Sequence, residues 1–318
     1  AGTGPFLLPV ADTVVRLGRE VAAVLESSRL SGWLPHMRSA ARVPEKALEG
    51  AGYAWTFLRE RIPYRTQTVI TEILGDDRVE AVRTARIDCL GEVVAGTERI
   101  LDDIDAVGLG WGFTPQLELP VSLGAGTRVD VDGSLVAIVD EGQRSSVPGL
   151  LLAGEVTGVG GAVLAVAEGR VAGAVAAAEV TGRTAPGLRA ERATIARHRA
   201  FAAAMHRAHP VPAGWEDRLG EETIVCRCEE VSAGAIVRAR DGLAATDTRS
   251  QKNMTRAGMG WCQGRECGFA VTCLAGRGGE APAGAGDPAR AEDAAASLAQ
   301  TMKRPVAQPV PLSAFFEL

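Results

Sequence analysis

Four of the six cysteines lie in one short region of the sequence. Cys226 and Cys228 form a C-x-C pair within VCRCEEV, and Cys262 and Cys267 follow with C-x-x-x-x-C spacing within GWCQGRECGF. Thiolates are soft ligands, and four of them can close a tetrahedral sulfur site for an iron-sulfur cluster or zinc. Structural zinc prefers C-x-x-C pairs, and the glycines around Cys262 let backbone amides approach sulfur. The pattern therefore favours a 2Fe-2S cluster over zinc; four unrelated buried cysteines are the third interpretation.

A second group of residues that could bind a cofactor lies in VPGLLLAGEVTGVGG, residues 147–161. An apolar strand would end at Gly154 and Glu155, and Gly160 and Gly161 would lead into a helix. A helix N-terminus presents unpaired amides and positive potential, which suits a phosphate or an electron-rich flavin ring. A flavin site is the favoured interpretation, and an ordinary strand-loop-helix with a surface glutamate is the alternative.

The chain opens with a third candidate, the glycine turn AGTGPFLLPV. Gly2 and Gly4 would make a tight turn close to a pyrophosphate, and Glu26 at the end of the next strand could hold a ribose hydroxyl. Leu7 occupies the position of the third glycine, so the fingerprint is incomplete. A vestigial nucleotide domain with the same turn is nearly as good an interpretation. Because no strand precedes the turn, we expect an upstream segment to be missing and FAD to be held poorly by this chain alone.

These candidates require an α/β scaffold in a chain of 318 residues, long enough for about two domains. The patterns predict helices over residues 5–18, 44–61, 161–181 and 188–208. They predict strands over residues 20–26, 66–74, 78–88, 104–110, 134–140 and 149–156. Strands 66–74 and 78–88 are expected to pair antiparallel, and 149–156 is expected to lie in a parallel sheet. The Gly, Ala and Pro content of residues 275–300 predicts a linker, and the prolines of 304–312 predict an extended tail.

Charge and composition exclude several classes of function. The net charge of −5 argues against a general nucleic-acid binder. The apolar stretch 160–180 contains Glu168 and Arg170, so no membrane-spanning segment is expected. Cysteines without a signal peptide favour the reducing cytoplasm. Cys273 lies outside the ligand pattern and is expected to be a small core residue. The four histidines are scattered, and no catalytic residue can be named.

The cysteine motifs resemble a known family of cluster-binding domains. CRC followed by TRAGMGWCQGRECG resembles the bacterioferritin-associated-ferredoxin-like 2Fe-2S domain over residues 222–275. VPGLLLAGEV followed by AEGRVAG is similar to the last FAD-binding strand of two-dinucleotide-domain flavoproteins, with Glu155 where many relatives have Asp. Cys262 and Cys267 share a spacing with redox-active thiols of disulfide reductases, but their C-x-C partner disfavours that alternative.

In combination the motifs resemble the FAD and iron-sulfur subunits of bacterial amine and imino-acid dehydrogenases, a family with opine oxidase, hydroxyproline dehydrogenase, hydrogen cyanide synthase and sarcosine oxidase alpha relatives. The resemblance implies a Rossmann-like two-dinucleotide-domain flavoprotein, partial here, followed by a small helical 2Fe-2S domain. It implies five regions: a second dinucleotide-binding domain (1–104), the C-terminal part of the FAD domain (105–185), a helical connector (186–221), the 2Fe-2S domain (222–275) and a linker with tail (276–318).

The same resemblance implies an electron-transfer subunit that carries FAD and a 2Fe-2S cluster, with NAD(P) or another nucleotide at the second dinucleotide site. Its implied partners are a separate flavin-containing subunit that oxidises the amine or amino acid, and an electron acceptor. Two alternatives remain open: a stand-alone NAD(P)H-dependent flavin oxidoreductase, and a non-catalytic binding module stabilised by zinc.

Overall fold

The computed structural model describes residues 1–184, 187–276 and 288–306. These residues form two compact units of mixed α/β structure. Unit 1 comprises residues 1–113, 162–167 and 189–215, and unit 2 comprises 114–161, 168–188 and the chain from 216 onward. Each unit is therefore assembled from segments that lie far apart in the sequence.

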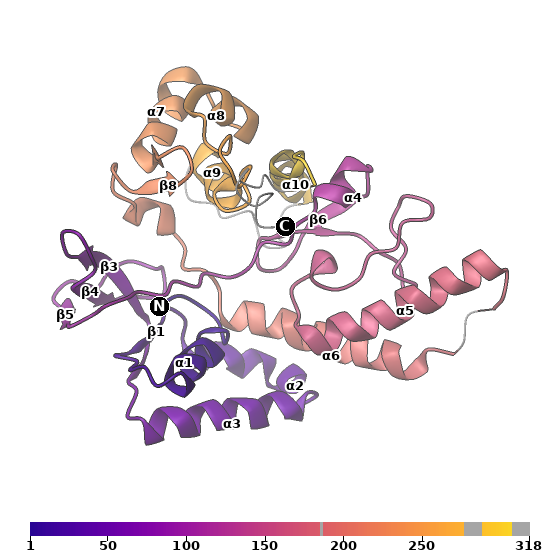
Figure 1. The fold of residues 1–318 in the computed structure, drawn as a ribbon, viewed down its shortest axis with the longest axis horizontal. Coiled ribbons are helices and arrows are strands. Elements are labelled where there is room, and N and C mark those ends of the chain that lie inside the picture. The colour runs from indigo at the N-terminus through magenta and orange to yellow at the C-terminus, as the bar shows by residue number, and fades with distance from the viewer. Residues whose placement is uncertain (185–186, 277–287, 307–318) are drawn as a thin grey trace, which may run out of the picture. The chain divides into compact units, whose positions relative to one another are not determined.

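Unit 1 begins with the glycine turn and the elements that follow it (Figure 1). Its helices are α1 (Leu7–Arg16), the 3-10 helix η1 (Leu30–His36), α2 (Met37–Ala40), α3 (Pro44–Arg59) and α6 (Arg189–Ala208). Its strands are β1 (Val24–Glu26), β2 (Tyr64–Thr66), β3 (Thr68–Leu74), β4 (Ala81–Arg86) and β5 (Arg99–Asp102). The predictions of helices over 5–18, 44–61 and 188–208 are confirmed, as is the antiparallel pairing of the strands now defined as β3 and β4.

Parallel pairing in unit 1 brings the glycine turn next to the end of β1. Strand β1 pairs in parallel with β2, and Gly2 forms isolated parallel bridges to Glu26 on one side and Gly110 on the other. Helix α3 begins with Pro44 at its first turn, where the missing N–H costs nothing, and Phe57 on its inner face joins Leu7 and Val24 in the core. The core thus fixes α1 and β1 around the turn.

Unit 2 contains short strands and most of the remaining helices. The strands are β6 (Thr127–Val129), β7 (Leu135–Ala137), β8 (Ile224–Cys226) and β9 (Val231–Ser232). The helices are α4 (Glu118–Ser122), η2 (Glu155–Thr157), α7 (Ala233–Leu243), α8 (Thr248–Thr255), α9 (Gly268–Ala275) and α10 (Pro288–Met302). Helix α5 (Ala162–Thr181) and the 3-10 helix η3 (Trp215–Arg218) each have residues in both units.

Helix caps explain where the helices around the cysteines begin. The Ser232 hydroxyl accepts a hydrogen bond from the amide of Ala235 at 3.3 Å, at the start of α7. The Asp247 carboxylate accepts from the amides of Arg249 and Ser250 at the start of α8. Such caps satisfy amides that have no partner inside the helix, and each is worth about 1 kcal/mol.

Three predicted elements differ from the structure. Residues 104–110 are mostly exposed and pair only through the bridge at Gly110, so the buried strand predicted there was wrong. Residues 149–156 form no parallel strand, because Leu151 has only an isolated antiparallel bridge to Arg144. Residues 288–302 form α10 rather than linker, because Leu298 and Met302 are buried in a core with Leu117 and Leu135. Residues 277–287 and 307–312 of the predicted linker and tail lie outside the described residues.

Among the described residues, no helix is both long enough and apolar enough to cross a membrane. The predicted domain boundaries stay a prediction.

Candidate functional site

The four candidate cysteine ligands come together in unit 2. Cys226 ends β8, Cys228 follows it in the turn before β9, and Cys262 and Cys267 lie in the loop that leads into α9. Cys226 and Cys267 are buried, in a core with Ile236 on α7, whereas Cys262 is half-buried and Cys228 is exposed. In each motif, therefore, one cysteine is buried and the other is closer to solvent.

The thiols are linked to one another in pairs. Burial by itself would raise the pKa of Cys262, but hydrogen bonds from the amide of Glu266, the thiol of Cys228 and the amides of Gly264 and Arg265 lower that pKa below its ordinary value. Backbone amides aimed at a sulfur favour its thiolate form, which is the form that binds metal. The surroundings of Cys262 thus favour its thiolate form.

The pKa of the buried Cys267 is shifted in the opposite direction. Burial, and after it the nearby thiols of Cys226 and Cys262, raise the pKa of Cys267 to about 12. Crowded buried thiols resist ionisation, because each thiolate would face a second negative charge in a poorly solvated place. A bound cation would supply the missing positive charge, so the donor set fits a thiophilic metal centre.

Glycines hold the backbone close to the sulfurs. The amide of Gly258 donates to the Sγ of Cys226 at 3.5 Å. A Cβ added at Gly260 would lie 2.2 Å from the Cβ of Cys228, so only glycine fits between the two cysteine segments. Within the described ranges, no three His, Cys, Asp or Glu side chains are already arranged as a metal-ligand group. The four thiols would need to turn toward a common centre to bind one.

The two remaining cysteines lie apart from this set. Cys273 is half-buried on α9, and burial, followed by the nearby Glu216, raises its pKa to about 12. Cys89 is exposed in unit 1. Neither residue contributes to the pKa shifts of Cys262 and Cys267, and the assignment of the four ligands stays a prediction.

The predicted flavin-binding turn lies between η2 and the start of α5. The Glu155 side chain is exposed, and its Oε1 accepts a hydrogen bond at 3.0 Å from the amide of Gly161, the residue before α5. Gly154 has φ of +86° and Gly161 has φ of +87°, a conformation that disfavours side-chain-bearing residues. Glu155 therefore bonds to the residue just before the helix that was expected to face a cofactor, while its carboxylate stays accessible to solvent.

Glu168 is a functional candidate that the sequence reasoning missed. It is buried on α5, and its Oε2 accepts from the amide of Gly154 at 2.8 Å and from the Thr157 hydroxyl at 3.0 Å. These bonds hold the glycine turn against the helix. The sequence did contain a signal for this role, because an acid inside an otherwise apolar helix must find polar partners if it is buried.

The N-terminal glycine turn is enclosed by the chain itself. A Cβ on Gly2 would lie 1.8 Å from the carbonyl oxygen of Gly110, so packing against residue 110 is what requires glycine there. Gly4 has φ of +95° and donates its amide to Glu26 Oε2 at 3.0 Å. Glu26 Oε1 accepts from the amide of Ser28 at 2.9 Å. A ribose hydroxyl would have to share a carboxylate that is only 1% exposed.

His209 completes this cluster and was also missed by the sequence reasoning. The indole N–H of Trp33 can only donate, and it lies 2.9 Å from His209 Nε2. A neutral His209 therefore carries its proton on Nδ1, which lies 2.8 Å from the Ser28 hydroxyl and 3.5 Å from Glu26 Oε2. Because 183 positions separate Glu26 from His209 in the printed sequence, no local motif indicates the contact.

The Glu26 cluster gives a prediction about acid stability. Burial by itself would raise the pKa of Glu26, but hydrogen bonds from His209 and the Ser28 amide lower it below the ordinary value of 4.5. A lowered folded-state pKa means that the ionised carboxylate stabilises the fold above its unfolded pKa, and that this contribution is lost as pH falls through the folded value. Between about pH 5 and pH 3, the free energy of unfolding should fall more steeply in the wild type than in Glu26→Gln.

Urea unfolding at several pH values measures these slopes. Glu20→Gln, at an exposed position in the same unit, is the matched control and should keep the wild-type slope. Parallel curves for the wild type and Glu26→Gln would contradict the assignment.

Comparison with known proteins finds relatives that match most of this chain. No protein-family model matches the chain. Hydrogen cyanide synthase subunit HcnB of Pseudomonas aeruginosa is 30% identical over 84% of this chain and 58% of the relative. The A-type subunit of opine oxidase from Rhizobium meliloti (strain 1021) is 38% identical over 86% of this chain and 59% of the relative. The chain thus spans less than two thirds of the length of these curated relatives.

One solved structure extends the comparison to the fold. The crystal structure of L-proline dehydrogenase from P. horikoshii matches 84% of this chain and 48% of that chain, with a TM-score of 0.54 and 21% sequence identity. The chain accordingly shares the mixed α/β fold of that structure. Over most of its length the chain is therefore similar to the HcnB subunit of hydrogen cyanide synthase and to the A-type subunit of opine oxidase.

Proposed function

We propose that this chain is the electron-transfer subunit of a heteromeric amine or amino-acid dehydrogenase or oxidase, and that it carries FAD and a 2Fe-2S cluster. The observation that supports the proposal is that the segment of Cys226 and Cys228 lies against the segment that leads to Cys262 and Cys267, through the Gly258 amide on Cys226 Sγ and the close approach of Gly260 to Cys228. The relatives support the heteromeric part, because HcnB and the opine oxidase relative are both named as subunits.

Each group of residues has a distinct role in this proposal. Cys226, Cys228, Cys262 and Cys267 would be the cluster ligands. The amides of Gly258 and Gly264 would donate hydrogen bonds to ligand sulfur, which tunes a cluster and orders its ligands. When bound, FAD would supply two-electron chemistry and the cluster one-electron chemistry, so that together they convert between the two.

The flavin would lie at the turn formed by Gly154, Glu155, Gly160 and Gly161. Glu155 would orient a hydroxyl of the cofactor, and buried Glu168 would hold the turn in place through the Gly154 amide. Gly2, Gly4 and Glu26 would form the second dinucleotide site, for NAD(P) or another nucleotide. Since Glu26 already bonds within the chain, a nucleotide there would depend mainly on the backbone of the turn and the start of α1.

The substrate would be oxidised on a separate flavin-containing subunit, at a C–N bond of an amine or amino acid. This chain would receive the electrons and pass them to an acceptor, in the cytoplasm. The family resemblance of the motifs supports that substrate class.

Metal and chromophore analysis tests the proposal. Protein prepared without oxygen should contain about two iron atoms and two acid-labile sulfides per chain, with a visible absorption that bleaches on reduction. Zinc in place of iron, without colour, would support the zinc-stabilised binding module instead. Bleaching of a bound flavin by NAD(P)H without any partner subunit would support the stand-alone flavin oxidoreductase.

A further inference from the structure

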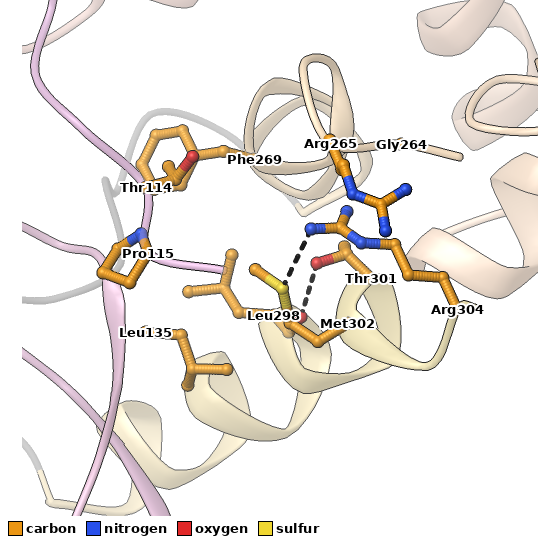
Figure 2. Close-up of a pocket in the computed structure, with 10 residues that line it drawn as sticks. All are labelled: Thr114, Pro115, Leu135, Gly264, Arg265, Phe269, Leu298, Thr301, Met302 and Arg304. Carbon is orange, nitrogen blue, oxygen red and sulfur yellow. Dashed lines mark hydrogen bonds between the residues drawn. The ribbon is translucent and has the colours of Figure 1, made fainter. Parts of the chain in front are cut away.

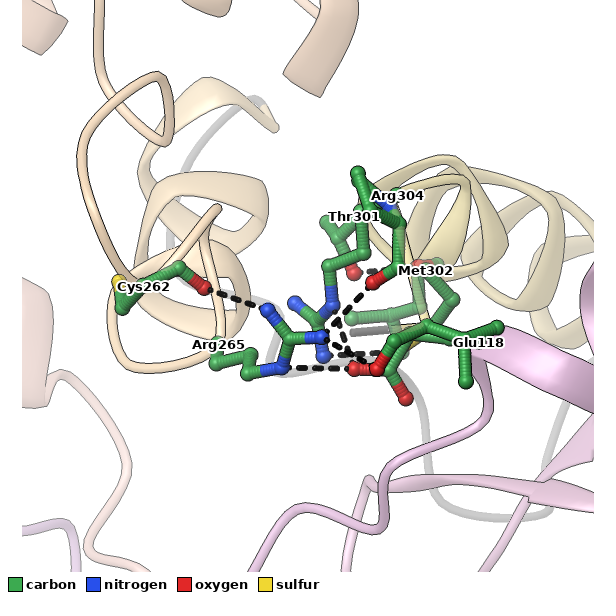
Figure 3. A network of polar contacts seen from close by, with 9 residues as sticks. Glu118, Cys262, Arg265, Thr301, Met302 and Arg304 are labelled. Carbon is green, nitrogen blue, oxygen red and sulfur yellow. Dashed lines mark hydrogen bonds and ion pairs between the residues drawn. The ribbon is translucent and has the colours of Figure 1, made fainter. Parts of the chain in front are cut away.

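A buried ion network in unit 2 includes a residue of the 262–267 loop and lies next to that loop. Glu118 at the start of α4, Arg265 in the loop and Arg304 after α10 meet at one carboxylate oxygen (Figure 3). The Nε atoms of both arginines lie 2.9 Å from Glu118 Oε1. The side chain of Glu118 is only 6% exposed, that of Arg265 5% and that of Arg304 3%. Charges are buried this completely only when they are paired, so the three residues form one interdependent group.

Arg265 joins this network to a candidate cluster ligand. One terminal nitrogen of its guanidinium donates to the carbonyl oxygen of Cys262 at 3.2 Å, and the other donates to the carbonyl oxygen of Pro305 at 2.8 Å. Figure 3 shows the side chain reaching from its loop between Cys262 and Glu118. The Nε of Arg265 is in an ion pair with Glu118 without a hydrogen bond, so the directional contacts of this guanidinium are those to the two backbone carbonyls. The position of the Cys262 backbone is thus coupled to residues of α4 and of the segment after α10.

Arg304 places a second positive charge close to the same loop. A Cβ added at Gly264 would lie 4.0 Å from a terminal nitrogen of Arg304. Another terminal nitrogen of Arg304 lies 3.4 Å from the sulfur of Met302. Because two guanidinium groups share one carboxylate, the network has one net positive charge, and little water reaches it. Poorly solvated charge acts on its surroundings more strongly than charge at the surface.

The space beside the network is too small to be a ligand site. The cavity in Figure 2 has a volume of about 10 Å³, about the room of one water molecule. Among the residues that line it are Leu135, Phe269, Leu298, Met302, Arg265 and Arg304. The two arginines therefore act on the loop and not on a molecule bound in this cavity.

We propose that Glu118, Arg265 and Arg304 are positioning residues for the sulfur site, which fix the backbone of the 262–267 loop and place one net positive charge next to it. The inference rests on the proposed 2Fe-2S function. Reduction adds negative charge to a cluster, so a buried positive charge nearby raises its reduction potential. The shape and the charge are separate effects, and different substitutions can measure them.

The charge is tested with Arg304→Met in the full chain. This variant leaves a neutral Glu118–Arg265 pair, so the cluster should keep its iron while its midpoint potential becomes more negative. Arg304→Lys keeps the charge and should return the potential toward the wild-type value. Lys303→Met removes a charge from the neighbouring, exposed residue and should leave the potential unchanged. Equal potentials in Arg304→Met and Lys303→Met would overturn the charge role.

The shape is tested with Arg265→Met, by hydrogen exchange of the amides in residues 260–268 and by iron content. Exchange should become at least several-fold faster and iron occupancy should fall, whereas Lys303→Met should match the wild type in both. Wild-type exchange rates in Arg265→Met would overturn the positioning role. If the variant does not fold, the Arg304 series still decides the charge role. Wild-type protein without iron would instead refute the proposed function, and the exchange comparison would still report on the loop.

Discussion

Replacing Cys262 by serine is expected to abolish the visible absorption of the cluster and to reduce bound iron more than about tenfold. Loss of an outer-shell hydrogen bond already weakens metal binding by about 10–100-fold, so loss of a ligand should cost at least as much. Nearby backbone amides, with that of Glu266 contributing most, also lower the pKa of the Cys262 thiol. Serine offers a hard oxygen in place of a soft thiolate at that position. Absorption spectra and iron and sulfide analysis of oxygen-protected protein measure the result.

Cys273→Ser is the matched control for this experiment. Cys273 lies six residues beyond Cys267 in the printed sequence, on α9, and is half-buried like Cys262, but it does not belong to the linked thiols. We expect this variant to keep the wild-type spectrum and iron content. Equal loss in the two variants would show that the ligand assignment is wrong.

Replacing Glu118 by glutamine is expected to lower the free energy of unfolding by about 3–5 kcal/mol, the cost of removing one partner from a buried ion network. The amide keeps the shape of the side chain but leaves Arg265 and Arg304 facing each other without a carboxylate. Both guanidinium groups are almost fully buried, so water cannot replace the lost partner. Urea unfolding monitored by circular dichroism measures the change.

Glu222→Gln provides the control, because Glu222 is exposed in the same unit and its loss should change stability by less than about 0.5 kcal/mol. Unfolding curves that coincide for Glu118→Gln and Glu222→Gln would contradict a central role for the network. The experiment does not depend on a bound cofactor, so it also separates the stability of the scaffold from the redox proposal.

Local patterns were sufficient to predict several elements of the fold. Helix α3 has a proline at its N-terminus and the apolar residue Phe57 on its buried face, which both agree with a helix there. Strands β3 and β4 follow from two apolar runs on either side of a Gly-Asp-Asp turn. The ligand set of the sulfur site was read from soft side chains at close spacing, and it stays a prediction. The helix and the hairpin depend on residues within a few positions of one another, and the ligand set depends on two short motifs.

Two errors came from elements whose partners lie elsewhere in the chain. An apolar run such as residues 149–156 becomes a parallel strand only with neighbours on both sides, and Leu151 has one isolated antiparallel bridge. The Ala-rich segment before residue 303 was read as linker from its glycines and prolines. Alanine also has the best helix propensity, and burial of Leu298 and Met302 decides the outcome in favour of α10.

From the sequence one obtains the chemistry that the cysteines and glycines can perform, because thiolate softness and backbone freedom belong to the residues themselves. Which charged residues pack beside the cysteines is decided by the tertiary structure alone. Glu118 and Arg304 are 186 positions apart and meet at a carboxylate beside the loop of Cys262. Contacts over such separations follow from how whole elements pack, since burial of charge is stable only where distant segments bring opposite charges together.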